Sequence, residues 1–168
     1  MRTRTATTDL ALVAVFAALV AACTLVPAIP IGVVPITLQT LGVMLAGLVL
    51  GARRGFLAVL LYVVVGLAGL PVFAQGAAGI GTLLKPSAGY LLAFPLGALV
   101  AGLVAKLVVN WRGAKQYFGL FLAGVAGSLV VHGLGIVGLM VGVAHLSLAA
   151  AFAVDVAFWP GDLLKMFA

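Results

Sequence analysis

Long apolar segments, separated by short breaks rich in proline, glycine or charge, run along almost the whole chain. An apolar helix of about 20 residues is long enough to cross the hydrocarbon core of a bilayer. The breaks place such helices, ahead of a less regular C-terminal segment, at about residues 10–25, 36–51, 55–70, 88–108 and 117–143. The pattern therefore predicts an all-α membrane protein in a single domain, residues 1–168, with room for five or six spans.

The longest interruption is residues 71–90, PVFAQGAAGIGTLLKPSAGY. Its glycines and prolines prevent a long helix, and it is about twice as long as an ordinary connection between helices. It also carries several large apolar residues, which a disordered, solvated linker would not contain. We therefore prefer an ordered, functional loop to a disordered one, with Gln75 as its one amide and Lys85 as its one cation.

Composition agrees with a membrane protein, because 65% of the residues are hydrophobic and 7% are charged, whereas about a quarter are charged in soluble domains. The net charge of +6 comes from scattered basic residues, and without a dense patch it does not indicate nucleic-acid binding. If the spans alternate, Lys85 and Lys165 lie on one side and the other basic residues lie opposite: Arg2, Arg4, Arg53, Arg54, Lys106, Arg112 and Lys115. This asymmetry predicts a multi-pass protein of the cell membrane with a cytoplasmic N-terminus.

Polar residues near or inside the expected spans carry further predictions. Thr8 and Asp9 are expected to cap the N-terminus of the first helix. Gln39 is expected to face the bundle or a cavity, because an unpaired amide is costly at membrane depth. His132 could relay protons, but no carboxylate follows it at helical spacing. We therefore expect a hydrogen bond from His132 to a nearby carbonyl. Cys23 stands alone, so neither a disulfide nor a thiolate metal site is expected.

Three alanines in the first span, Ala14, Ala18 and Ala22, recur every fourth residue and form a strip of small side chains on one face of the helix. Such a strip lets another helix approach closely. It could serve internal packing or the docking of a partner protein, and from the residues alone internal packing is preferred.

The C-terminal PGDLLK contains an acidic and a basic residue, Asp162 and Lys165, three positions apart after Pro160. This spacing places both on one face of a helix. The pair could be a local salt bridge that neutralises two costly charges. Alternatively it could clamp a ligand, because a carboxylate accepts two N–H donors while an ammonium donates to a carbonyl, which suits a cyclic urea or amide.

Three motifs, PITLQTLGVMLAGLVLG, GLAGLPVFAQGAAG with LLKPSAGYLLAF, and PGDLLK, resemble the BioY family. These proteins are the biotin-binding membrane subunits, or S components, of energy-coupling factor (ECF) transporters, and the resemblance covers essentially the whole chain. It implies a bundle of six transmembrane helices that binds biotin near its outer face. It also implies a transmembrane coupling subunit and two cytoplasmic ATPase subunits, which use the ATP. No metal or cofactor is expected on this chain.

The resemblance also implies roles for particular residues. Asp162 would bind the ureido N–H groups of biotin, and Lys165 would bind the ureido carbonyl or the ligand carboxylate. Gln75 would add a polar contact, while Tyr90 and Trp159 would form apolar wall. The complete expected set is Gln39, Gln75, Lys85, Tyr90, Trp159, Asp162 and Lys165. The alanine strip resembles the motif by which such subunits dock on the coupling protein, which reverses the preference for internal packing.

Two features depart from the family pattern. A last helix that begins at Pro160 has nine residues here, about 14 Å, which is too short to span a bilayer. We therefore expect a truncated last helix, with residues 146–157 as a short outer helix. The alternative is one span over residues 146–167, which would bury Asp155. The second departure is Gln75, where many relatives are expected to have asparagine.

Two other functional classes remain as alternatives. A gradient-driven carrier would need a titratable group inside the membrane, for which Asp155, Asp162 and His132 are candidates. A membrane enzyme would need a cluster of acid, base or metal-binding groups. The chain has three carboxylates and two histidines, so we expect no catalytic residue and no enzyme activity.

Overall fold

The computed structural model describes residues 6–29 and 34–167, which form helices and turns with one isolated bridge between Ile29 and Ile36. Arg2 and Arg4, which contributed to the predicted orientation, lie outside the described residues. The helices are α1 (Ala6–Ala22), α2 (Gln39–Leu50), α3 (Ala52–Leu67), α4 (Ala88–Val108), α5 (Ala114–Val141), α6 (Leu148–Val156) and α7 (Trp159–Phe167), with two 3-10 helices, η1 (Ala74–Gly76) and η2 (Ile80–Leu84).

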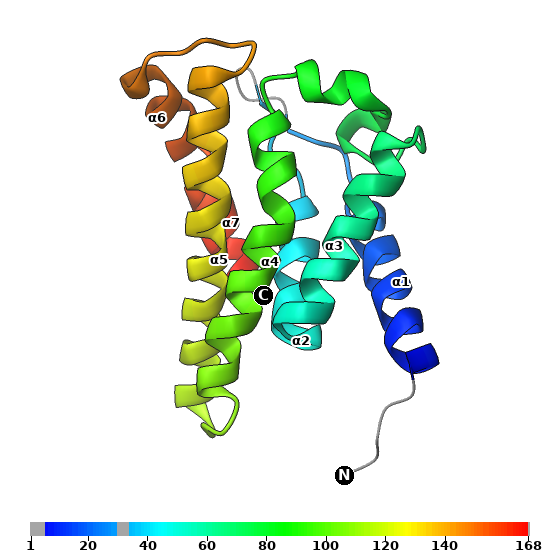
Figure 1. The fold of residues 1–168 in the computed structure, drawn as a ribbon. Helices are drawn as coiled ribbons and strands as arrows, with labels where there is room; N and C mark the ends of the chain where they lie inside the picture. Colours follow the sequence, from blue (N-terminus) through cyan, green and yellow to red (C-terminus); the bar gives the residue numbers. More distant parts are fainter. Residues whose placement is uncertain (1–5, 30–33, 168) are drawn as a thin grey trace.

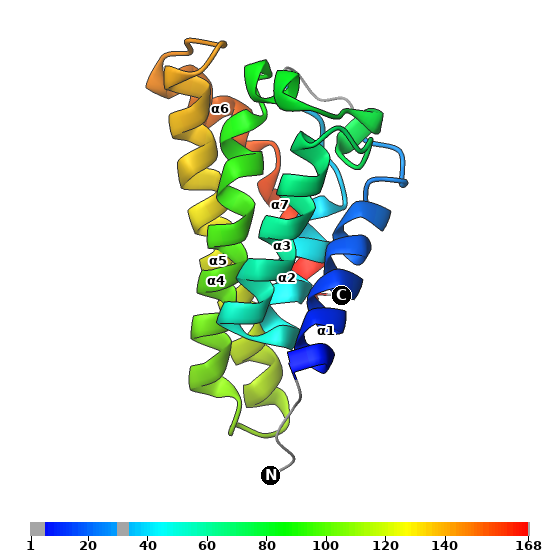
Figure 2. The same cartoon turned by 45° about the vertical axis from the view of Figure 1, so that its right-hand side comes forward.

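The helices form a bundle in which α4 and α5 are the longest elements and lie side by side (Figures 1 and 2). Both are long and apolar enough to cross a membrane. Helices α1, α2 and α3 pack beside them, and the short α6 and α7 supply the sixth, broken member of the bundle. The predicted fold class, an all-α bundle of six helices, is confirmed.

Glycines bring α4 and α5 into close contact. A Cβ atom added to Gly89 would lie 2.7 Å from the Cα atom of Gly138, so the two backbones touch at this point. One turn from Gly138, Gly135 leaves room for the Tyr90 ring, which a side chain there would strike. The glycine-rich face of α5 therefore sets the position of Tyr90, as expected for helices that pack through small residues.

The first helix differs from its prediction at both ends, because it runs over Ala6–Ala22 instead of residues 10–25. Asp9 lies inside the first turn and does not cap the helix. Its carboxylate pairs with Arg54 on α3 at 2.9 Å. The predicted N-cap is therefore wrong. In the first turn, the Asp9 carboxylate is stabilised by the helix dipole and by its ion pair with a cation on another helix.

The alanine strip faces away from the bundle. Ala14, Ala18 and Ala22 are exposed, whereas Ala17 and Val20 on the opposite side of α1 are buried. Internal packing, which the residues alone favoured, is therefore not the role of this strip within the described residues.

The C-terminal segment is two helices, not one span. It breaks between Val156 and Trp159, and Pro160 lies in the first turn of α7, as its lack of an N–H group favours. The expected short helix over residues 146–157 corresponds to α6, at the same end of the bundle as η1 and η2 (Figure 1). Asp155 is nevertheless buried, at 1% exposure, although its burial was the reason for rejecting a single span.

The two ends of the bundle differ in charge. The α2–α3 junction and the α4–α5 connection lie at the end where α1 begins, and the long loop between α3 and α4, residues 68–87, lies at the opposite end (Figures 1 and 2). The first end carries five of the described basic residues: Arg53, Arg54, Lys106, Arg112 and Lys115. Lys85 belongs to the long loop, so the predicted separation holds for these residues.

Candidate functional site

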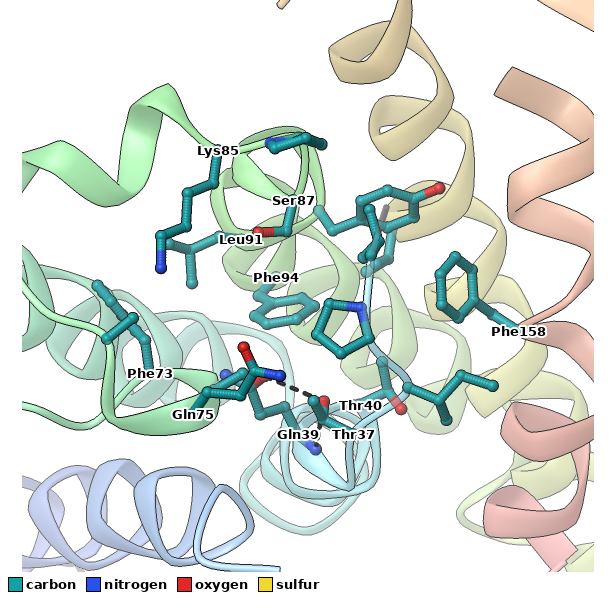
Figure 3. Close-up of a pocket in the computed structure, with 18 of the residues that line it drawn as sticks. Thr37, Gln39, Thr40, Phe73, Gln75, Lys85, Ser87, Leu91, Phe94 and Phe158 are labelled. Atoms are coloured by element: carbon teal, nitrogen blue, oxygen red, sulfur yellow. Dashed lines mark hydrogen bonds between the residues drawn. The ribbon is translucent and has the colours of Figure 1, made fainter. Parts of the chain in front are cut away.

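A cavity of about 190 Å³ lies under the long loop, between the start of α2, the first turns of α4 and the C-terminal helix α7 (Figure 3). The residues that line it include most of the set expected from the sequence: Gln39, Gln75, Lys85, Tyr90, Asp162 and Lys165. Positions from four different parts of the chain are thus brought to one cavity. Trp159, the remaining member of the set, is not among the lining residues.

The long loop is an ordered cover that is tied to α3. Gln75, Gly76 and Gly79 have positive φ angles of 59°, 70° and 76°, which bend the chain back over the cavity. The amide of Gly79 donates to the carbonyl of Gly66 at 2.7 Å. Phe73 packs its ring edge-on against Tyr62, with the ring centroids 5.5 Å apart. The prediction of an ordered loop is therefore confirmed.

The middle of the cavity is apolar. Phe94 lies near its centre, and Phe73 and Phe158 lie toward opposite sides (Figure 3). Tyr90 packs against Phe158 with the ring centroids 5.7 Å apart. An apolar ligand body of modest size can therefore be shielded from water between polar ends.

The start of α2 contributes polar groups to the cavity. Gln39 is buried, at 5% exposure, and its Nε2 group donates a hydrogen bond to the Tyr62 hydroxyl. Its Oε1 atom accepts from the Thr37 hydroxyl at 3.0 Å. The expectation that this amide faces the bundle or a cavity is confirmed, and its bonds hold it in place.

Asp162 and Lys165 form the predicted pair at the α7 end, with 2.6 Å between Nζ and Oδ1. Lys165 also donates to the Thr37 carbonyl at 2.6 Å and to the Thr40 hydroxyl at 3.1 Å. An ammonium group has three protons, so each proton of Lys165 has a partner. A ligand carbonyl must therefore replace one of these bonds to reach Lys165.

Asp162 keeps capacity for a further donor. Its Oδ1 atom accepts from Lys165 at 2.6 Å and from the Thr40 hydroxyl at 2.8 Å. Its Oδ2 atom lies 3.1 Å from His132 Nε2 and has no other partner among the described residues. Because each carboxylate oxygen can accept two hydrogen bonds, Oδ2 can take one more N–H group.

His132 lies between two carboxylates instead of bonding to a carbonyl. Its Nδ1 atom is 2.7 Å from Asp155 Oδ1, and its Nε2 atom is 3.1 Å from Asp162 Oδ2. The expected carbonyl bond is therefore wrong. The carboxylates belong to α6 and α7, and a search at helical spacing along α5 could not find them.

Asp155 accepts two further hydrogen bonds behind the cavity. The Tyr90 hydroxyl donates to its Oδ1 atom at 3.0 Å, and Trp159 Nε1 donates to its Oδ2 atom at 3.1 Å. The indole of Trp159 stacks on the His132 ring, with the centroids 4.6 Å apart. Trp159 thus supports the imidazole from outside the cavity lining.

The loop side of the cavity is more open. Gln75 and Lys85 are both exposed, and neither side chain forms a hydrogen bond or ion pair with another described residue. The Lys85 side chain extends beside Leu91, on the opposite side of the view from Phe158 (Figure 3). Asp162 lies close to Phe158, because its backbone N–H group donates to the Phe158 carbonyl. Lys85 therefore offers a cation at the end of the cavity remote from Asp162.

The sequence did not place two threonines, a histidine and an aspartate at this site. Thr37 and Thr40 lie in the PITLQT segment, where their spacing around Gln39 was a usable signal. His132 and Asp155 were each noticed singly, but their pairing depends on contact between helices that are distant in sequence.

The arrangement suits binding. One end offers a carboxylate acceptor and an ammonium, the middle is apolar, and the other end offers an accessible cation. A molecule with paired N–H donors at one end, an apolar body and an anionic group at the other matches these features.

Comparisons with known proteins agree with one another. A family model described as "BioY family" matches residues 1–168. A protein of Rhizobium etli named "Biotin transporter BioY" is 44% identical, and the alignment covers 95% of this chain and 87% of that protein. A protein of the same name from Rhodobacter capsulatus is 43% identical, with 94% of this chain and 87% of the relative covered.

A solved structure is also similar. The crystal structure of the S-component for biotin from an ECF-type ABC transporter matches with a TM-score of 0.87 and 28% sequence identity. The match covers 98% of this chain and 89% of that one.

Proposed function

The chain belongs to the BioY family, and on this premise we propose that the cavity under the long loop binds biotin for uptake across the membrane. The resemblance of the three motifs to this family is confirmed. The protein acts in biotin transport and is not an enzyme. It is a membrane protein, and the cavity is lined partly by the long loop, which lies at the end of the bundle opposite most of the described basic residues (Figure 1).

Asp162 has an acceptor position that no described residue occupies, and this position supports biotin binding. Biotin has a ureido ring with two N–H donors and one carbonyl, an apolar thiophane ring and chain, and a carboxylate. The Oδ2 atom of Asp162 accepts a ureido N–H group, since its single partner among the described residues is His132. The ureido carbonyl takes one of the three donor positions of Lys165 in exchange for its bond to Thr40, which at 3.1 Å is the longest.

The ligand carboxylate pairs with Lys85 in this proposal. Lys165 has no spare proton, whereas Lys85 is exposed, lines the cavity and has no ion-pair partner among the described residues. The thiophane ring and the chain lie along Phe94 and Leu91 between the two ends. Gln75 supplies a further polar contact from the loop.

Titration of the purified protein with biotin tests the binding directly. We expect saturable heat at one site per chain for biotin, and no heat for a straight-chain fatty acid that has the carboxylate but lacks the ureido ring. Equal heat for both compounds, or none for biotin, would contradict the proposed site.

The partners are a transmembrane coupling subunit and two cytoplasmic ATPases, which supply ATP energy. This set of partners is proposed from the similarity of the fold to the S-component of an ECF-type transporter. The N-terminus is cytoplasmic, because this orientation puts Arg53, Arg54 and the α4–α5 connection on the cytoplasmic side. Uptake of labelled biotin should require the ATPases. Uptake that persists without them and follows an ion gradient would instead favour a gradient-driven carrier.

The exposed alanine strip on α1 is the proposed docking face for the coupling subunit. Replacing Ala14 or Ala18 by leucine should abolish uptake and leave biotin affinity unchanged, because the added bulk blocks helix approach without touching the cavity. Ala153→Leu, at an exposed alanine on α6, is the matched control and should retain uptake. Loss of biotin binding in the Ala14 or Ala18 variant would contradict this role.

A further inference from the structure

We infer that Asp155 is a positioning residue that keeps His132 doubly protonated, so that Asp162 stays an ionised acceptor for the ligand. The inference rests on the proposed biotin site. It concerns Asp155 and His132, to which the proposed function assigns no role. Asp155 does not line the cavity, whereas Asp162 does. His132 lies between them.

The geometry of the imidazole sets the proton positions. His132 Nδ1 is 2.7 Å from one carboxylate oxygen, and Nε2 is 3.1 Å from another. An ionised carboxylate can only accept hydrogen bonds. A neutral imidazole has one nitrogen without a proton, so it would set a lone pair against one of these carboxylates. Two ionised carboxylates therefore require an imidazolium that donates from both nitrogens.

Charge balance supports the same arrangement. The titratable groups that face His132 or bond to its partners are Asp155 from α6, Asp162 and Lys165 from α7, and Tyr90 from α4. With an imidazolium, two negative and two positive charges cancel while Tyr90 stays neutral. Buried charges are tolerated when they are paired and hydrogen-bonded in this way.

Asp155 is the residue that holds this arrangement together. It is buried, at 1% exposure, and accepts from Tyr90, Trp159 and His132, which lie on three different helices. Asparagine at this position has a single side-chain acceptor oxygen and no charge. His132 would then lose the partner that stabilises its second proton, and Asp162 would face a lone pair or become protonated. Either change removes the acceptor that the ureido N–H group needs.

A double-mutant cycle separates this action from a general structural role. Asp155→Asn should weaken biotin binding about tenfold, as expected when a hydrogen bond to a charged group is impaired. In an Asp162→Asn background the same substitution should change affinity by less than about twofold, because Asp155 acts through Asp162. Asp9→Asn, at the carboxylate paired with Arg54 outside the cavity, is the matched control and should leave affinity unchanged.

An equal loss in both backgrounds, or no loss in the wild-type background, would overturn the inference. If Asp155→Asn does not fold, nitrogen NMR of histidine-labelled wild-type protein decides the matter without any mutation. The chain has two histidines, and the exposed His145 serves as the internal reference. At about pH 8, where an unperturbed imidazole in a model peptide is neutral, both ring nitrogens of His132 should carry protons. A neutral His132 ring would overturn the inference, whether or not biotin proves to be the ligand.

Discussion

The two ends of the cavity are built in opposite ways. At the α7 end, Asp162 is buried. It and Lys165 bond to fixed partners just before α2, on α2 and on α5. At the loop end, Gln75 and Lys85 are exposed and bond to no other described side chain. Electrostatic and hydrogen-bond energies are larger where water is excluded. The α7 end is therefore suited to recognising a ligand, and the loop end to admitting and covering it.

The largest effect should come from the buried end. Asp162→Asn removes the charge that receives the ureido N–H group while nearly preserving the shape of the side chain. Hydrogen bonds to charged groups contribute about 1.5 to 3 kcal/mol, so affinity should fall by roughly one to two orders of magnitude. Calorimetric titration measures this loss. An unchanged affinity in a folded sample would show that the buried α7 end does not recognise the ligand more strongly than the loop end.

A smaller effect is expected at the loop end. Lys85→Gln removes an exposed cation, and exposed ion pairs contribute about 0.2 to 1 kcal/mol, so biotin affinity should fall by about 1.4- to fivefold. The loss should disappear for the amide of biotin, which lacks the carboxylate. Lys106→Gln, at an exposed lysine outside the cavity, is the control. A loss as large as that of Asp162→Asn would show that the loop end also recognises the ligand strongly.

The smallest effect is expected at Gln75. Gln75→Asn retains the amide and suits the backbone, because asparagine tolerates the left-handed conformation that this residue adopts, with φ 59°. Biotin affinity should change by less than about twofold, as only the reach of a neutral hydrogen bond is altered. A larger loss would show that the reach of this side chain matters and that the loop end also contributes to specificity.

Much of the fold follows from the apolar pattern. The fourth helix, expected at residues 88–108, is α4 (Ala88–Val108), because long apolar segments bounded by Pro86 and a polar turn leave little choice of end points. The first helix begins and ends earlier in the chain than the expected residues 10–25, since its ends depend on weaker signals and on the Asp9–Arg54 pair. Helix ends are generally less determined by local sequence than helix positions.

The site was predictable where its residues are neighbours along the chain. Asp162 and Lys165 are three apart, so helical spacing alone indicated their pairing. The contacts of His132 with Asp155 and Asp162 join residues 23 and 30 positions apart, and they exist because α6 and α7 fold back against α5. The burial of Asp155 likewise depends on donors from other helices, which no local pattern records.

In the proposed site, the buried pair on α7 binds the ureido group of biotin and is not only a structural salt bridge. Calorimetric titration of a folded Asp162→Asn, Lys165→Gln double variant separates these two roles, because the neutral pair leaves no uncompensated charge between the two positions. We expect biotin affinity to remain reduced by at least about tenfold, since the ligand still lacks its charged partners. Affinity near that of the wild type would contradict the claim.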